Sequence, residues 1–177
     1  MWESNNLAGV VVGGFLGIAG AISSGVLFQI WRDRQKRINL RSALAGELRA
    51  ILTVVDERRV LPALENIIDH IRMHQTVLFF PVWLGDMHSL VFRQNADKLG
   101  SLPAPLPERV VAVHYRIGSV ALELQMLFEA SQGRGGWLGE QWRSSWQRCL
   151  QQHEQVFTLA DEVRGLTAEV INELEGV

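Results

Sequence analysis

The sequence predicts an all-α protein: one N-terminal transmembrane helix that continues into a cytoplasmic bundle of about five helices. Three observations support this prediction. No charged side chain occurs between Ser4 and Trp31. After this stretch, apolar residues recur at spacings of three and four, which is the period of an amphipathic helix. Near the C-terminus this alternation is sustained over more than four heptads, from Trp142 to Leu174, which is typical of a bundle seam.

The uncharged stretch from residue 7 to residue 31 is long enough to cross a bilayer, because about 20 apolar residues suffice. A cleaved signal peptide is the alternative, and Ala19-Gly20-Ala21 resembles a cleavage site. Such a peptide would have a positive start and a shorter apolar core. Here Glu3 stands at the start and the cationic cluster follows the apolar run. The pattern therefore favours a retained transmembrane helix.

The small residues of this segment fall on one side of the helix, while bulky side chains occupy the other. Helices in lipid associate where small residues let their backbones approach closely. A face this long favours a homo-oligomer of four or more copies, whose spans would enclose a narrow apolar pore. Docking against a different membrane protein is the second interpretation. The face consists of Gly9, Gly13, Gly17, Gly20, Ala21, Ser24 and Gly25.

Positive charge follows the span directly, at Arg32, Arg34, Lys36 and Arg37. The positive-inside rule places this side in the cytoplasm and the N-terminus outside. The four side chains are the predicted contacts to lipid head groups. Seventeen basic residues include only two lysines, a usage typical of a GC-rich bacterial genome. We therefore expect a bacterial inner (plasma) membrane protein.

The cytoplasmic part divides into predicted helices in chain order. The transmembrane helix continues without a break through residue 52, with Gly46 as its first soft point. A second helix runs from Pro62 to about Gln75, and residues 76–83 form a buried loop or helix end. A third helix spans residues 87–99 and stops at Gly100, read as a C-terminal cap. The predicted domains are residues 1–31, residues 32–60 as a basic juxtamembrane helix, and residues 61–177 as the bundle.

The second half of the bundle begins with a stiff connection containing Pro103 and Pro105. Pro107 then opens a fourth helix. The glycines of residues 131–136 make a flexible loop, which could also cradle a phosphate on its backbone N–H groups. The last helix carries its seam from Trp142 through His153 to Leu174.

Catalytic chemistry has little support in the sequence. His70 and His74 lie four residues apart, but the glutamate of a helical metalloprotease motif and a third ligand are missing. Asp86 and His88 suit a helix cap better than an acid–base pair. His114 and His153 lie on apolar stripes, where a hydrogen-bonded core histidine is the ordinary case and a pH-responsive contact the alternative. Cys149 is the lone cysteine and lies on the same seam. We therefore predict no enzyme activity, no cofactor and no metal site.

Cationic side chains spread over several helices are the remaining candidates for ligand binding. If they converge, they make a site for an anionic ligand such as a nucleotide or an oligonucleotide; if they do not, they are an ordinary salt-bridged surface. The candidates are Arg58, Arg59, Arg72, Arg93, Arg109 and Arg116.

The layout of a single span over residues 7–31 and a small cytoplasmic domain resembles the short single-span effectors of bacterial antiphage systems. The resemblance implies a cytoplasmic domain that binds a nucleotide-derived signal and a membrane part that breaches the bilayer. It includes no diagnostic motif and assigns no ligand-binding residue. The alternative is a membrane-anchored adaptor or accessory subunit, for which the tryptophans Trp137, Trp142 and Trp146 would suit a partner-binding surface.

Overall fold

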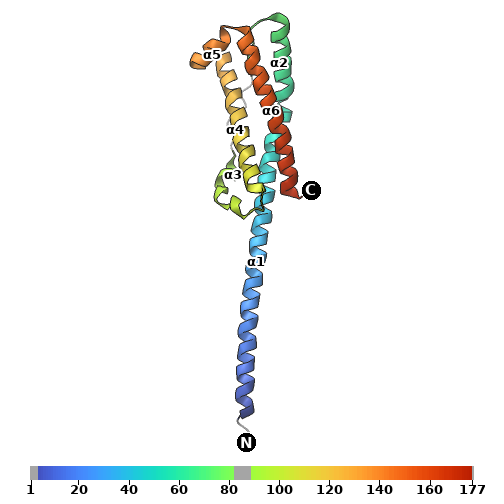
Figure 1. The fold of residues 1–177 in the computed structure, drawn as a ribbon, viewed down its shortest axis with the longest axis vertical. Helices are drawn as coiled ribbons and strands as arrows, with labels where there is room; N and C mark the ends of the chain where they lie inside the picture. Colours follow the sequence, from blue (N-terminus) through green and yellow to red (C-terminus); the bar gives the residue numbers. More distant parts are fainter. Residues whose placement is uncertain (1–3, 82–88, 177) are drawn as a thin grey trace. The chain divides into compact units, whose positions relative to one another are not determined.

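A computed structural model describes the backbone of residues 4–81 and 89–176, and the side chains of residues 26–81 and 89–176. The chain divides into two compact units, residues 1–40 and residues 41–177. The described residues contain only helices and connecting segments, so the all-α prediction is confirmed. The elements are α1 (Ser4–Glu57), α2 (Val60–His74), α3 (Leu90–Gln94), the 3₁₀ helix η1 (Ala96–Ser101), α4 (Leu106–Ser131), α5 (Gly136–Arg143) and α6 (Trp146–Glu175) (Figure 1).

Helix α1 is unbroken from Ser4 to Glu57, as the sequence predicts for residues 7–52. Gly46 does not interrupt it. The helix ends where Arg59 adopts a left-handed conformation with φ 51°, and α2 begins at the next residue. Pro62 thus lies in the first turn of α2, where its missing N–H costs no hydrogen bond. The second predicted helix is confirmed.

The predicted third helix over residues 87–99 is wrong. The described part of this region forms the five-residue helix α3 and then the 3₁₀ helix η1. The break is at Asn95, whose backbone leaves the helical region at φ −124°. Its side chain donates a hydrogen bond to the carbonyl oxygen of Val91 at 2.9 Å, a local bond that competes with continued helix. Gly100 lies within η1 and is not a helix cap.

The predicted single C-terminal helix over residues 142–174 is also interrupted. Ser145 has an extended backbone at φ −152°, and its hydroxyl accepts a hydrogen bond from the backbone N–H of Arg148. Serine is a favoured N-cap for this reason, so α6 starts after it and Trp142 belongs to α5. Gly139 of α5 packs closely against the backbone of Arg134. A Cβ at this position would stand 2.7 Å from the carbonyl oxygen of Arg134, so a larger residue would clash there.

Helix α6 is the centre of the bundle, because α2, α4 and α5 all pack against it (Figure 1). Most of the predicted seam is confirmed, since one stripe of the helix is buried throughout its length. Phe80, in the connection after α2, is fully buried in the same core, which agrees with a buried loop. The buried residues of α6 are Cys149, His153, Val156, Ala160, Val163, Thr167, Val170, Ile171 and Leu174.

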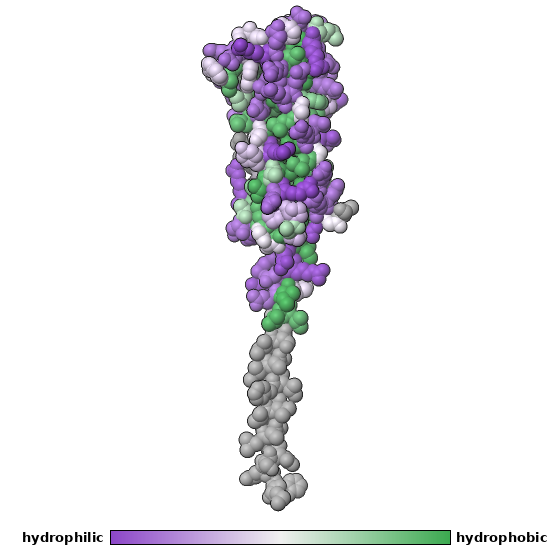
Figure 2. All heavy atoms as spheres, viewed as in Figure 1, coloured by the Kyte–Doolittle hydropathy of each residue, from purple (hydrophilic) through white to green (hydrophobic). Residues whose placement is uncertain are grey.

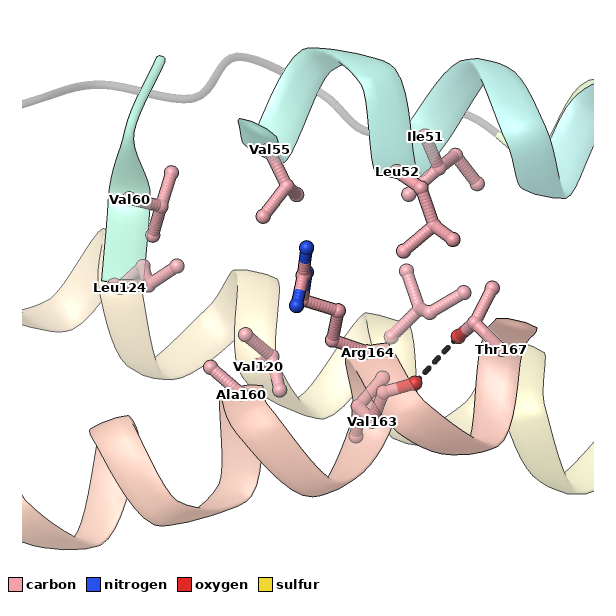
Figure 3. Close-up of a pocket in the computed structure, with 11 residues that line it drawn as sticks. Ile51, Leu52, Val55, Val60, Val120, Leu124, Ala160, Val163, Arg164 and Thr167 are labelled. Atoms are coloured by element: carbon pink, nitrogen blue, oxygen red, sulfur yellow. Dashed lines mark hydrogen bonds between the residues drawn. The ribbon is translucent and has the colours of Figure 1, made fainter. Parts of the chain in front are cut away.

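A small apolar cavity of about 30 Å³ remains where α1, α2, α4 and α6 meet (Figure 3). Val55, Val120 and Val163 line it, together with the stem of Arg164. The hydroxyl of Thr167, which also lines it, donates to the carbonyl oxygen of Val163 at 2.6 Å. The cavity is therefore a packing defect close to the break between α1 and α2.

Val163→Ile is expected to fill this cavity, because the added methylene is about as large as the void. At roughly 24 cal/mol per Å³, the free energy of unfolding should rise by about 0.7 kcal/mol. Thermal unfolding of the full chain in detergent, followed by circular dichroism, measures the gain. Val111→Ile is the matched control, because Val111 is exposed on α4, and it should leave stability unchanged. A loss of stability in Val163→Ile would show that the site cannot accept the methylene.

Candidate functional site

The described end of the predicted span is an exposed apolar band followed by an exposed cationic turn. Val26, Leu27, Phe28, Ile30 and Trp31 are each more than half exposed. The side chains of the four predicted head-group contacts follow them and are also exposed. Figure 2 shows this change from apolar to polar surface directly after the grey residues.

The predicted small-residue face, from Gly9 to Gly25, lies outside the described side chains. The same holds for most of the predicted span. Within the residues that the structure describes, none of the helices combines the length and the apolar character needed to cross a membrane. Both predictions therefore stay predictions.

Within the described part of the chain, Arg72 and Arg109 of the six predicted anion-binding arginines are seen held by carboxylates. Arg72 pairs with Glu154 at 2.6 Å and with Asp69 at 3.6 Å. Arg109 pairs with Glu169 at 2.8 Å and with Glu173. Their charges serve helix packing, which is the ordinary salt-bridged interpretation.

The other four arginines lie at separate places in the described chain. Arg58 and Arg59 form the junction between α1 and α2, and both are exposed. Arg116 is exposed on α4, whereas Arg93 lines a groove between α3 and α4. The structure thus brings no described group of these six residues to one common site.

Two arginines that the sequence analysis did not single out hold the C-terminal end of α6. Arg41 donates from Nε to the carbonyl oxygen of Leu174 at 2.7 Å and from Nη2 to that of Glu173 at 2.8 Å. Arg49 pairs with Glu175. Cations are favoured here because the last carbonyls of a helix are unpaired and the helix dipole is negative at this end.

A buried carboxylate joins α1, α3 and α4. Glu47 accepts hydrogen bonds from the backbone N–H groups of Val91 at 2.6 Å and Phe92 at 3.1 Å. It also contacts Nε2 of His114 at 3.2 Å, and the two side chains are 8% and 2% exposed. An acidic residue in register with the apolar positions Leu44 and Leu48 was the signal available in the sequence, because an unpaired buried carboxylate is rare.

Burial lowers the pKa of His114 to about 4, so the ring is neutral near pH 7. Its Nε2 then donates to Glu47, which leaves Nδ1 as an acceptor. This atom is buried and has no hydrogen-bond partner among the described residues. The rings of Phe92 and His114 pack edge to face, with their centroids 4.2 Å apart.

The second buried histidine, His153, belongs to α6. Its Nδ1 donates to the carbonyl oxygen of Cys149 at 2.8 Å, and burial lowers the pKa of the ring. Burial raises the pKa of the Cys149 thiol, which donates to the carbonyl oxygen of Leu78 at 3.3 Å. A thiol in this state is a poor nucleophile, as expected from the sequence.

A groove between α3 and α4 has a volume of about 490 Å³. Phe92 and Arg93 come from α3, and His114, Tyr115 and Gly118 from α4. Binding sites for small molecules commonly have this size and combine apolar walls with a few polar groups.

The remaining candidates add no site. The rings of His70 and His74 lie 4.4 Å apart, but no group of three or more potential ligands for a metal occurs among the described residues. Asp86 and His88 lie outside the described residues. In the loop of residues 131–136, Arg134 pairs with Glu129 at 2.6 Å.

Arg41→Met should destabilise the bundle, because it removes two charged hydrogen bonds to the end of α6. We expect a loss of about 1–3 kcal/mol in the free energy of unfolding, measured by denaturant titration of the full chain. Arg116→Met is the control, since that side chain is exposed and has no ion pair among the described residues. Equal effects of the two changes would contradict the capping role of Arg41.

Stability should fall as the pH is lowered from about 6.5, because the unfolded chain then takes up a proton on His114 that the folded chain refuses. With the folded pKa near 4, the free energy of unfolding should drop by about 2 kcal/mol between pH 7.5 and pH 5 from this residue. His114→Gln should make the pH dependence shallower by that amount, whereas His70→Gln, on an exposed position, should not. Identical pH profiles for His114→Gln and the unchanged chain would contradict the assignment.

Comparisons of this chain with protein-family models, with curated proteins and with solved structures found no match.

Proposed function

We propose that this chain is a single-pass membrane protein that self-assembles through residues 9–25 and acts as a channel or membrane-disrupting effector. Its helical bundle would be the cytoplasmic sensor of an anionic ligand. The observation that carries the proposal is the sequence of exposed groups on α1: the apolar band of residues 26–31, followed at once by four exposed cationic residues.

The apolar band supports a membrane location. Five large apolar side chains within six residues of one helix leave much of their area in water. Full burial of each such side chain is worth roughly 1.5–3 kcal/mol, and a bilayer supplies that burial on all sides of a helix. Aromatic rings such as those of Phe28 and Trp31, which stack with centroids 6.1 Å apart, are favoured at the interface.

The cationic turn supports the orientation. Lys36 is 3.2 Å from Asp33, while Arg32, Arg34 and Arg37 face solvent. Each such cation near an anionic leaflet contributes about 1 kcal/mol of attraction. The bundle would then lie in the cytoplasm, which agrees with its single, reduced and buried cysteine.

The proposed gating uses contacts within the bundle. Arg41, Glu47 and Arg49 all belong to α1 and reach α6, α3 and α4. A ligand that shifts these helices would therefore change the contacts of α1. A pore lined by small apolar residues is controlled by its width and its wetting, so a small change in helix packing would suffice.

The test is a comparison of Gly17→Ile with Val12→Ile in the full chain. Gly17 belongs to the small face and Val12 to the bulky side, so the first change should block close helix approach and the second should not. We expect the unchanged chain to resist extraction from membranes by alkaline carbonate, to run as one oligomer in detergent and to release dye from liposomes. Gly17→Ile should stay in the membrane but lose the oligomer and the leakage.

Each other outcome has a defined meaning. Extraction of the unchanged chain by carbonate would overturn the membrane span. An unchanged oligomer in Gly17→Ile would exclude the small face as the seam. A monomer that co-purifies with another membrane protein would favour the adaptor, for which exposed Trp137 on α5 is the described surface feature.

A further inference from the structure

We propose that the groove between α3 and α4 binds a planar aromatic anion, with Arg93 contacting the anionic group and Phe92 and Tyr115 contacting the ring. This inference rests on the proposed function, because it names the place and the ligand class of the sensor. Its test is independent of the membrane assays.

The positive charge of Arg93 favours an anionic ligand in the groove. Arg93 is exposed in the groove and makes no ion pair with any residue that the structure describes. This distinguishes it from Arg72 and Arg109, whose carboxylate partners occupy them. A guanidinium group binds a carboxylate or a phosphate by two parallel hydrogen bonds.

The exposed apolar and aromatic side chains of the walls favour a ligand with an aromatic ring. Tyr115 is 78% exposed and Leu122 is 57% exposed on the α4 side, although both are large and partly apolar. A flat ligand that covers them would remove this area from water and gain a stacking contact. The volume of about 490 Å³ accommodates two fused rings and one anionic group.

The floor of the groove is open because Gly118 has no side chain. A Cβ placed on Gly118 would meet no atom within 4 Å. Glycine weakens a helix interior by about 1 kcal/mol relative to alanine, and α4 is a long helix with no break at this position. The residue therefore leaves open space on the α4 side of the groove.

A buried and unsatisfied group marks the inner wall. His114 lines the groove with a side chain that is 2% exposed, and its Nδ1 has no described partner. Buried acceptors without a partner are uncommon and call for an explanation such as a ligand or an ordered water. This observation is independent of the charge of Arg93.

Both walls are already fixed before a ligand binds. Glu47 holds the backbone of Phe92 on one side and the ring of His114 on the other. A preformed site loses less free energy to ordering when it binds. Because Glu47 belongs to α1, a ligand that displaces either wall also acts on the helix that leads to the membrane.

The experiment uses 1-naphthyl phosphate as the probe, with 1-naphthol and inorganic phosphate as its two halves. Binding to the full chain in a nonionic detergent is measured by equilibrium dialysis, with empty micelles subtracted. We expect saturable binding of 1-naphthyl phosphate, at least about tenfold tighter than that of either half. Arg93→Gln should weaken it by about tenfold or more, the equivalent of one or two charged hydrogen bonds.

Gly118→Leu is the sharper variant, because its Cβ meets no atom within 4 Å and the leucine side chain would occupy the groove. We expect it to abolish saturable binding. Gly165→Leu on α6 is its control, since a Cβ there also meets nothing within 4 Å, and Arg116→Gln is the control for Arg93→Gln. Both controls should bind as the unchanged chain does.

The proposal is overturned if the unchanged chain shows no saturable binding, or if Arg93→Gln and Gly118→Leu bind like their controls. Equal affinity for inorganic phosphate would exclude the aromatic contact, and equal affinity for 1-naphthol would exclude the contact with Arg93. A chain that binds the probe but is extracted by carbonate keeps the groove and loses the proposed function. A chain that resists extraction but fails to bind the probe keeps the proposed membrane function and excludes the groove as a binding site.

Discussion

The bundle depends on how the long helix α6 is held along its length and at its end. Its buried stripe supplies the apolar surface on which α2, α4 and α5 pack. That surface is non-directional, so it stabilises contact without choosing a register. The register is set by directional contacts: Arg72 meets Glu154 near the start of α6, Arg164 of α6 meets Asp56 at 3.1 Å near the middle, and Arg41 caps its end. These contacts require α1 and then α2 to run antiparallel to α6.

This arrangement explains why several of the arginines are occupied by contacts within the bundle. The exposed ion pairs are each worth at most about 1 kcal/mol, but several of them at successive levels select one alignment of the helices. Arg109 joins α4 to the same end of α6 that Arg41 and Arg49 hold. Arg93 makes no such ion pair among the described residues, and it lines the groove between α3 and α4. Whether an arginine is structural or free to bind a ligand thus depends on the acidic side chains that the fold places beside it.

Periodicity predicted the long helices and the buried stripe of α6 because these follow from local spacing. It failed at Asn95, where a side chain bonds to the backbone of the preceding turn as α3 ends, and at Ser145, whose side chain caps the first turn of α6. A pattern of apolar residues does not register such a bond. It also failed to find the buried pair of Glu47 and His114, which are 67 residues apart. Their contact forms only when α1 and α4 pack together, so the spacing of residues along the chain does not predict it.

The buried pair also limits what the protein can tolerate. Glu47 accepts three contacts, from two backbone N–H groups and one imidazole, and these compensate the cost of removing a carboxylate from water. An apolar residue at this position would leave two N–H groups at the start of α3 without that partner and would free the ring of His114. Glu47 thus connects both walls of the groove to α1 through hydrogen bonds. In the proposed sensor, this connection would carry the effect of a bound ligand to α1.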